Sequence, residues 1–205
     1  YTFTPPNTLG YTAKSAFEFN PEKARKLLAE AGYPDGKDFP VTELLYNTSE
    51  SHRKIAVAIQ QMWNQYLGVN IILNNQDWKV YLDSVGNGDY SIARAGWIGD
   101  YVDPNTFLDM WVTEGGNNHT GWSNPRYDEL ILKLAPTIPD RAMRYKLMAE
   151  AEAILLEDMP IIPIYIYNSK SLVHPSLKGL QPNILDYVLY KNLSLDPSLS
   201  GVNIH

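Results

Sequence analysis

The sequence predicts an α/β fold in which helices cross over between the strands of one sheet. Segments with an apolar period near 3.6 alternate along the chain with short runs rich in β-branched residues. The predicted order is helix, strand, helix, strand, helix, strand, further helices and a last strand. The length of 205 residues is enough for one sizeable α/β domain or two small lobes.

The first half of the chain holds three of the expected helix–strand pairs. Asn20 and Asp77, and either Ser49 or Ser51, can cap helix N-termini with side-chain oxygens. Gly32 and Gly68 end the first two helices. We expect, in order, helix 20–32, strand 41–47, helix 49–68, strand 69–75, helix 77–82, a turn at 86–89 and strand 90–96.

The second half is richer in helices. Asp103-Pro104 begins a helix that reaches about Val112, and Asn124-Pro125 repeats this kind of start. Pro139-Asp140 opens a long amphipathic helix to about Asp158. Residues 161–168 predict a strand, and Pro163 favours an edge position for it. From residue 174 onward the pattern is less regular.

Composition narrows the classes of function. The net charge is −6 and basic runs are absent, which makes nucleic acid an improbable partner. The chain has no cysteine, which excludes disulfides and thiolate chemistry, and its four histidines lack metal-ligand spacing. We therefore expect neither a metal site nor a cofactor. Fourteen tyrosines and five tryptophans suit a surface that binds polar and apolar groups together.

Charged and aromatic residues converge at "ARAGWIGDYVDP", residues 93–104. Arg94 lies on a predicted strand, and a buried guanidinium needs a paired acceptor. Asp100 could supply it in an internal salt bridge, the alternative that spacing alone favours. In the other alternative, both charges face a cleft and meet opposite ends of a zwitterionic ligand. Gly96 and Gly99 would let another backbone approach closely.

Three further residues are candidates for the same cleft. His52 lies in the first turn of its predicted helix, where free N–H groups attract anions, although it could equally be a solvated histidine at a helix end. Trp78 and Trp97 could line side-chain pockets, although such rings are more often core. Motifs of a nucleophile with its base, of a P-loop and of a dinucleotide fingerprint are absent, so we expect no enzyme.

Five motifs in order, "YNTS", "LGVN", "NQDW", "ARAGW" and "DYVDP", closely resemble the oligopeptide-binding proteins of bacterial ABC importers, the peptide/nickel solute-binding family. The resemblance runs from about residue 20 to 195. It implies a type II periplasmic-binding-protein lobe with a mixed sheet and flanking helices. Members are much longer, and this chain resembles their C-terminal portion. Residues 1–173 would form most of the C-terminal lobe, and 174–205 would return toward the other lobe.

The resemblance also implies a role for each candidate. Asp100 would pair with the ligand's α-ammonium, and Arg94 and His52 would serve its carboxylate. Other residues would line the cleft: Trp78, Trp97, Gly96, Asn47 and Tyr165. A position that is basic in related proteins is Val85 here, which puts in doubt a charge contact at that pocket.

The implied function is capture of short peptides outside the cytoplasm, in the periplasm or anchored at the cell surface, and their delivery to an ABC transporter. The implied partners are short peptides, the permease subunits and the missing N-terminal lobe. The alternatives are a different ligand, such as a murein peptide, a metal chelate or a sugar, or a hydrolase. The sequence start "YTFTPPNTLG" lacks an initiator Met and a charged leader region, so we expect a fragment that holds half a cleft and binds peptide weakly by itself.

Overall fold

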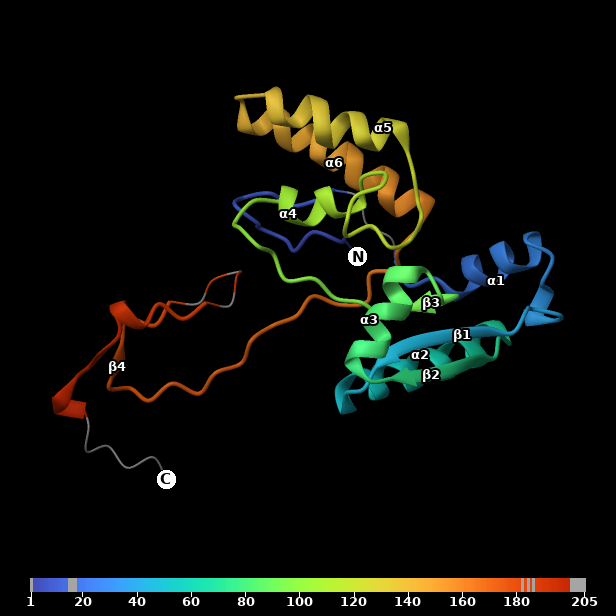
Figure 1. Ribbon diagram of the computed structural model, residues 1–205, viewed down its shortest axis with the longest axis horizontal. Coiled ribbons are helices and arrows are strands. Elements are labelled where there is room, and N and C mark those ends of the chain that lie inside the picture. The colour runs from blue at the N-terminus through green and yellow to red at the C-terminus, as the bar shows by residue number, and fades with distance from the viewer. Residues whose placement is uncertain (1, 15–17, 182, 184, 186, 200–205) are drawn as a thin grey trace. The chain divides into compact units, whose positions relative to one another are not determined.

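The computed structural model describes residues 2–14, 18–181, 183, 185 and 187–199 (Figure 1). The chain divides into two units. Unit 1 combines Tyr1–Ala16, Ile98–Asp109 and Arg126–His205, and unit 2 combines Phe17–Trp97 and Met110–Pro125. Among the described residues, the helices are too short or too polar to cross a membrane.

Unit 2 is built on a parallel three-stranded sheet in the order β2-β1-β3. The central strand β1 (Thr42–Asn47) pairs along its whole length with β2 (Ile71–Gln76). On its other side, Leu44 and Leu45 pair with β3 (Ile92–Ala93). Helices α2 (Glu50–Leu67) and α3 (Trp78–Asn87) connect these strands, so the predicted α/β class and its crossover helices are confirmed.

The core of unit 2 follows from the two periodicities of strand and helix. Leu44 and Tyr46 alternate on one face of β1 and pack with Ala56 of α2. The side chains packed around this cluster come from α1 (Pro21–Glu30), α2 and the strands, among them Leu28, Ile59, Trp63, Leu67 and Ile92. Figure 1 shows α2 lying along one face of the sheet. Burial on that face fixes the register of the strands.

Local signals set most of the helix ends in unit 2. The side chain of Asn20 accepts a hydrogen bond from the Lys23 N–H at 2.9 Å, and that of Asp77 accepts from the Lys79 N–H at 3.0 Å. Gly68 ends α2 in the left-handed region, with φ +69°. Ser49 lies at the predicted N-cap position of α2, but its side chain accepts no hydrogen bond from the backbone N–H groups of the helix; its Oγ lies 2.9 Å from Ser51 Oγ instead.

Unit 1 is mainly helical. Its longest helix, α6 (Arg141–Asp158), begins at the predicted cap Asp140 and ends where predicted. The buried carboxylate of Glu152 on this helix accepts hydrogen bonds from the N–H groups of Phe3 and Thr4 and from the Tyr11 hydroxyl, at 2.9–3.1 Å. These bonds tie the N-terminal segment to α6.

The remaining elements of the described chain are short. They are η1 (Pro34–Gly36), α4 (Asn105–Leu108), η2 (Asp109–Trp111), α5 (Pro125–Asp128), η3 (Glu129–Leu134), η4 (Ala135–Thr137), β4 (Leu177–Lys178), η5 (Tyr190–Asn192), β5 (Ser194–Leu195) and η6 (Pro197–Leu199). Strands β4 and β5 pair antiparallel. The described sheets therefore include both parallel and antiparallel pairing.

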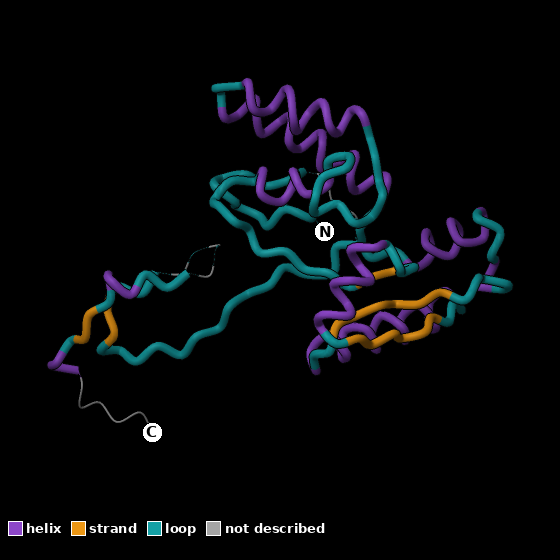
Figure 2. Tube along the Cα trace, viewed as in Figure 1, coloured by secondary structure: helices purple, strands orange, loops and turns teal. Residues whose placement is uncertain are grey.

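Three predicted elements need correction. The third strand is only Ile92–Ala93, and α3 extends beyond Leu82 to Asn87. The predicted strand 161–168 is wrong: all eight of these residues are described, and they run as loop (Figure 2). Pro163 lacks a backbone donor, and a strand exists only where its backbone finds a partner. Ile162, Ile164 and Tyr165 are about half exposed in this segment.

Candidate functional site

The candidate site in unit 2 lies at one edge of the parallel sheet. Parallel strands end at the same edge, and in open α/β sheets the crevice outside their carboxyl ends is where ligands bind. Asn47 is the last residue of β1 and lies opposite Gln76, the last residue of β2. Arg94 directly follows β3, and its N–H donates to the Leu45 carbonyl at 2.8 Å.

His52 reaches this edge from the first turn of α2. Its Nδ1 lies 2.9 Å from Asn47 Oδ1, and Asn47 is buried. Burial lowers the pKa of His52, and the positive charge of Arg94 lowers it further, while a hydrogen bond with Asn47 opposes the shift. Since Oδ1 only accepts, the neutral ring carries its proton on Nδ1 and leaves Nε2 without one.

The side chains beside His52 on α2 are engaged within the helix. Arg53 donates to both carboxylate oxygens of Glu50 at 3.0 and 3.2 Å, and Lys54 Nζ lies 3.8 Å from Glu50 Oε1. All three side chains are exposed. Arg53 and Lys54 therefore both face the carboxylate of Glu50.

Trp78 begins α3 at the same edge of the sheet. Its ring is 58% exposed and stacks on Tyr81, with centroids 5.6 Å apart. Tyr81 is buried, and its hydroxyl donates to the Arg94 carbonyl at 2.5 Å. Burial raises the pKa of Tyr81, which keeps the hydroxyl protonated and able to donate. Sequence reasoning missed Tyr81, although its place three residues after Trp78 on a helix would have signalled the stack.

Asp100 lies in a loop of unit 1, and its side chain is exposed. Its backbone N–H donates to Thr106 Oγ1 at 2.9 Å. The preceding Gly99 is buried against α4: a Cβ there would lie 3.0 Å from Thr106 Cγ2 and 3.1 Å from Phe107 Cζ. Gly99 therefore allows the loop to pack against its own helix, a role the sequence did not suggest.

The other predicted residues lie in loop. Gly96 is exposed and Trp97 is half-buried, both in the segment that follows β3. Tyr165 is 50% exposed in unit 1, and its ring lies 4.9 Å from that of Tyr167. The structure thus brings Asn47, His52 and Arg94 together in unit 2. Asp100 and Tyr165 belong to unit 1, so their contribution to the same site stays a prediction, as does the choice between an internal Arg94–Asp100 bridge and two ligand contacts.

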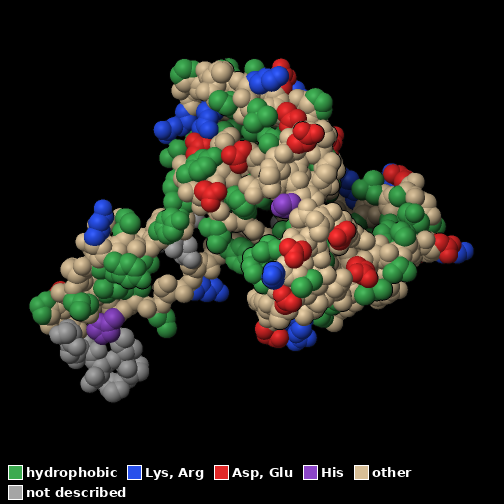
Figure 3. Space-filling model, viewed as in Figure 1, with side chains coloured by type: hydrophobic (Ala, Val, Ile, Leu, Met, Phe, Trp, Pro, Cys, Tyr) green, Lys and Arg blue, Asp and Glu red, His purple; other side chains and the backbone are tan. Residues whose placement is uncertain are grey.

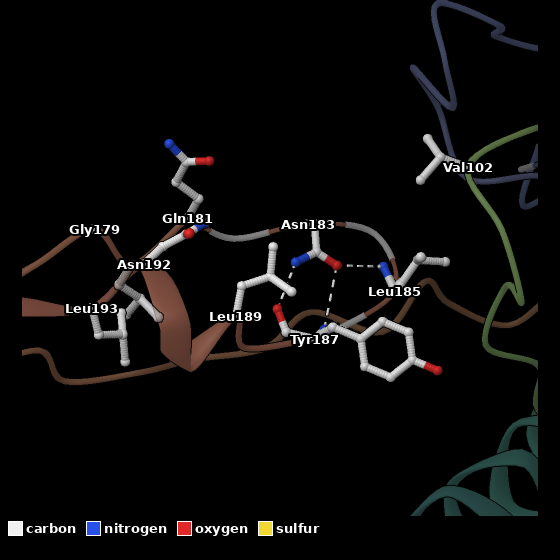
Figure 4. A pocket seen from close by; sticks show the side chains of 10 residues that line it. Val102, Gly179, Gln181, Asn183, Leu185, Tyr187, Leu189, Asn192 and Leu193 are labelled. Carbon is white, nitrogen blue, oxygen red and sulfur yellow. Dashed lines mark hydrogen bonds between the residues drawn. The ribbon is translucent and has the colours of Figure 1, made fainter.

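A hollow of about 300 Å³ lies in the C-terminal part of unit 1. In Figure 4 the Asn183 side chain bonds to the Tyr187 carbonyl and to the N–H groups of Leu185 and Tyr187, at 2.7–3.3 Å. Its described lining contains no predicted site residue. Hydrophobic side chains gather on the surface of this part, at the left in Figure 3, where Tyr187, Leu189 and Tyr190 are more than half exposed.

In the part of the chain that the structure describes, groups of three or more His, Cys, Asp or Glu side chains placed to hold a metal ion are absent. The sheet edge of unit 2 is suited to binding an anionic group. The guanidinium of Arg94 and the titratable imidazole of His52 lie together there, beside the exposed ring of Trp78.

Comparison with known proteins connects this geometry to a family. A family model described as bacterial extracellular solute-binding proteins, family 5 Middle, matches residues 1–119. The oligopeptide-binding protein OppA of Bacillus subtilis is 40% identical over 85% of this chain and 32% of its own length. The periplasmic murein peptide-binding protein MppA of Escherichia coli is 41% identical over 92% of this chain and 36% of its own length.

A solved structure agrees with these relatives. The crystal structure of a periplasmic oligopeptide-binding protein from Borrelia burgdorferi aligns with a TM-score of 0.81 and 40% identity, over 94% of this chain and 39% of that one. The chain therefore spans about a third of the length of the curated relatives it matches. The fold class predicted from the resemblance, a lobe of a type II periplasmic binding protein, is confirmed. The chain belongs to the family of bacterial extracellular solute-binding proteins, family 5.

Proposed function

We propose that the full-length protein captures short peptides outside the cytoplasm, in the periplasm or anchored at the cell surface, and delivers them to the permease subunits of an ABC transporter. It binds and releases its ligand without chemical change. The observation that carries this proposal is the guanidinium of Arg94 beside His52 at the sheet edge of unit 2, an arrangement suited to a ligand's carboxylate. The exposed Asp100 of unit 1 is the proposed partner of the ligand's ammonium group.

In this kind of peptide capture, the affinity depends little on the amino-acid sequence of the ligand. Main-chain hydrogen bonds to an extended ligand give affinity without reading its side chains. Trp78 and Trp97 would wall the side-chain pockets, Gly96 would allow close backbone approach, and Asn47 and Tyr165 would line the cleft. Charged side chains at fixed positions in the protein would select peptides that have free termini and a matching length. Micromolar affinity requires only about −8 kcal/mol in total.

The rest of the full-length protein supplies the other wall of the cleft in this proposal. Relatives are about three times as long as this chain. The exposed apolar residues of 162–173 and 187–195 would pack against that remainder. Residues 174–205 would return toward the other lobe; part of this range lies outside the described residues. We expect the chain alone to bind peptide weakly.

Isothermal titration of the full-length protein with tri- to pentapeptides tests this function. Peptides with both termini free should bind at micromolar Kd or tighter, and peptides acetylated and amidated at their ends should bind at least about 30-fold more weakly, a loss of roughly 2 kcal/mol. Recovery of intact peptide after incubation separates binding from hydrolysis. Equal affinity for free and blocked peptides would overturn the proposal.

A second candidate ligand is a murein peptide, favoured by the 41% identity to the murein peptide-binding protein of Escherichia coli. It differs from an ordinary peptide in its linkage and in the charges that its side chains carry. Mass spectrometry of ligand released from the purified full-length protein distinguishes the two. Murein fragments would support the second candidate, and mixed linear peptides would support the first.

A further inference from the structure

We propose that Arg144 and Asp103 form a positioning pair for Asp100, which fixes the loop that presents this carboxylate to a ligand's ammonium group. Neither residue touches the ligand in this proposal. The inference rests on the proposed function, in which Asp100 binds the ammonium group of the ligand.

The pair is bidentate and partly shielded from water. Arg144 Nη1 donates to Asp103 Oδ2 at 2.8 Å, and Nη2 donates to Oδ1 at 2.7 Å. The two side chains are 23% and 20% exposed, whereas in the other ion pairs among the described residues both side chains are at least 46% exposed. Two parallel bonds fix direction as well as distance, which a single contact cannot do.

The fixed carboxylate of Asp103 organises the turn behind Asp100. Its Oδ1 also accepts from the Asn105 N–H at 2.9 Å, and its carbonyl accepts from the Thr106 N–H at 3.2 Å. Thr106 is buried, and its hydroxyl accepts the bond from the Asp100 N–H. A continuous path of hydrogen bonds therefore runs from α6 through Asp103 and Thr106 to the backbone of Asp100.

The electrostatics of the pair favour its ionised form. Burial alone would raise the pKa of Asp103, but the hydrogen bonds from Arg144 and the Asn105 N–H outweigh it and hold that pKa below its ordinary value; the charges of Arg144 and Arg141 act in the same direction. The hydrogen bond to Asp103 raises the pKa of Arg144. Replacing either residue would leave the other as a partly buried charge without its ion-pair partner.

Arginine suits this position better than lysine. A planar guanidinium matches both oxygens of a carboxylate at once, whereas an ammonium acts as a point charge on a flexible stem. The replacement Arg144→Lys therefore keeps the charge and loses the fork. A loosened loop would still carry Asp100, but over a wider range of positions, and affinity would fall only for ligands that use this carboxylate.

The test uses the full-length protein and two ligands, a tripeptide with a free amine and its N-acetylated form. Arg144→Gln should weaken the free-amine peptide about tenfold, within the range for residues coupled through one hydrogen-bond network, and the acetylated peptide less than about twofold. The affinity of Arg144→Lys for the free-amine peptide should lie between those of wild type and Arg144→Gln. If Arg144→Gln does not fold, Arg144→Lys is compared with wild type in its place. The control is Arg126→Gln on α5, which breaks two exposed pairs, with Glu129 and with Glu150 of α6, and should change neither Kd.

A double-mutant cycle separates positioning from general stability. In an Asp100→Ala background, Arg144→Gln should cause no further loss for either peptide, because no carboxylate remains to be positioned. Equal losses for both peptides, or additive losses in the cycle, would overturn the positioning pair. Failure of the proposed function looks different: wild type would then bind the free and acetylated peptides equally, and Asp100→Ala would change neither.

Discussion

Two regions of this molecule hold predicted ligand contacts by different means. In unit 2, Asn47 and Arg94 are placed by β-strand ends, and His52 by the start of α2. In unit 1, Asp100 is placed by a loop whose shape depends on side-chain contacts of Thr106, Asp103 and Arg144. The first arrangement shares the cooperativity of a packed sheet. The second depends on a few individual contacts, so single substitutions should affect it locally.

The largest expected effect is on the sheet-held region. Leu44→Ala removes a side chain that is 3% exposed in the core of unit 2, and should destabilise that unit by about 2–5 kcal/mol. Hydrogen–deuterium exchange of separate peptides covering β1 and α2 measures this loss. Ile72→Ala in the neighbouring strand is the control, because Ile72 is 50% exposed and should cost less than about 1 kcal/mol. Faster exchange confined to β1, with α2 unchanged, would contradict a cooperative sheet.

A smaller and more local effect is expected in the loop-held region. Gly99→Ala places a Cβ within 3.1 Å of Thr106 and Phe107 side-chain atoms, and should cost about 1 kcal/mol of local stability. Exchange should increase in 99–108 and stay unchanged in β1. Gly116→Ala is the matched control, since a Cβ there meets nothing within 4 Å. If both glycine variants behave alike, the tight packing of this loop is not what holds it.

The smallest expected effect is a pH dependence at the sheet edge. Since Nε2 of neutral His52 carries no proton, a peptide carboxylate there must be bound by the protonated ring. The lowered pKa of the unliganded His52 sets the lower end of the pH range over which binding takes up this proton. Affinity for peptides that reach His52 should therefore rise as pH falls, by at most about tenfold per pH unit. Titration in buffers of different ionisation enthalpy measures the proton uptake.

His52→Ala should abolish that pH dependence, and a dependence that survives this substitution would assign it to another group. The pH dependence of folding stability has the opposite sign to that of peptide affinity. Because the folded pKa of His52 is lowered, its contribution to stability is present above the unfolded value of about 6.5 and is lost as pH falls through the folded value. The ring is only partly buried, so solvent screening keeps this contribution small.

The sheet-held region could be predicted from sequence because its determinants are local. Helix caps such as Asn20, Asp77 and Gly68, and the two apolar periodicities, specify its elements within a few residues of chain. The contacts that complete the site act over longer distances. Tyr81 meets Arg94 13 residues later, and Arg144 meets Asp103 across 41; pairs this distant leave no spacing signal. The failed strand 161–168 shows the same limit, since apolar residues alone do not supply a partner strand.

The central claim is that Asp100 receives a ligand's free ammonium group. The most direct measurement is the Kd of the full-length protein and of its Asp100→Ala variant for one tripeptide and its N-acetylated form. The proposal predicts that Asp100→Ala weakens the free-amine peptide by about 2 kcal/mol, roughly 30-fold, and leaves the acetylated peptide nearly unchanged. Equal losses for both peptides would contradict it and favour the internal bridge between Arg94 and Asp100.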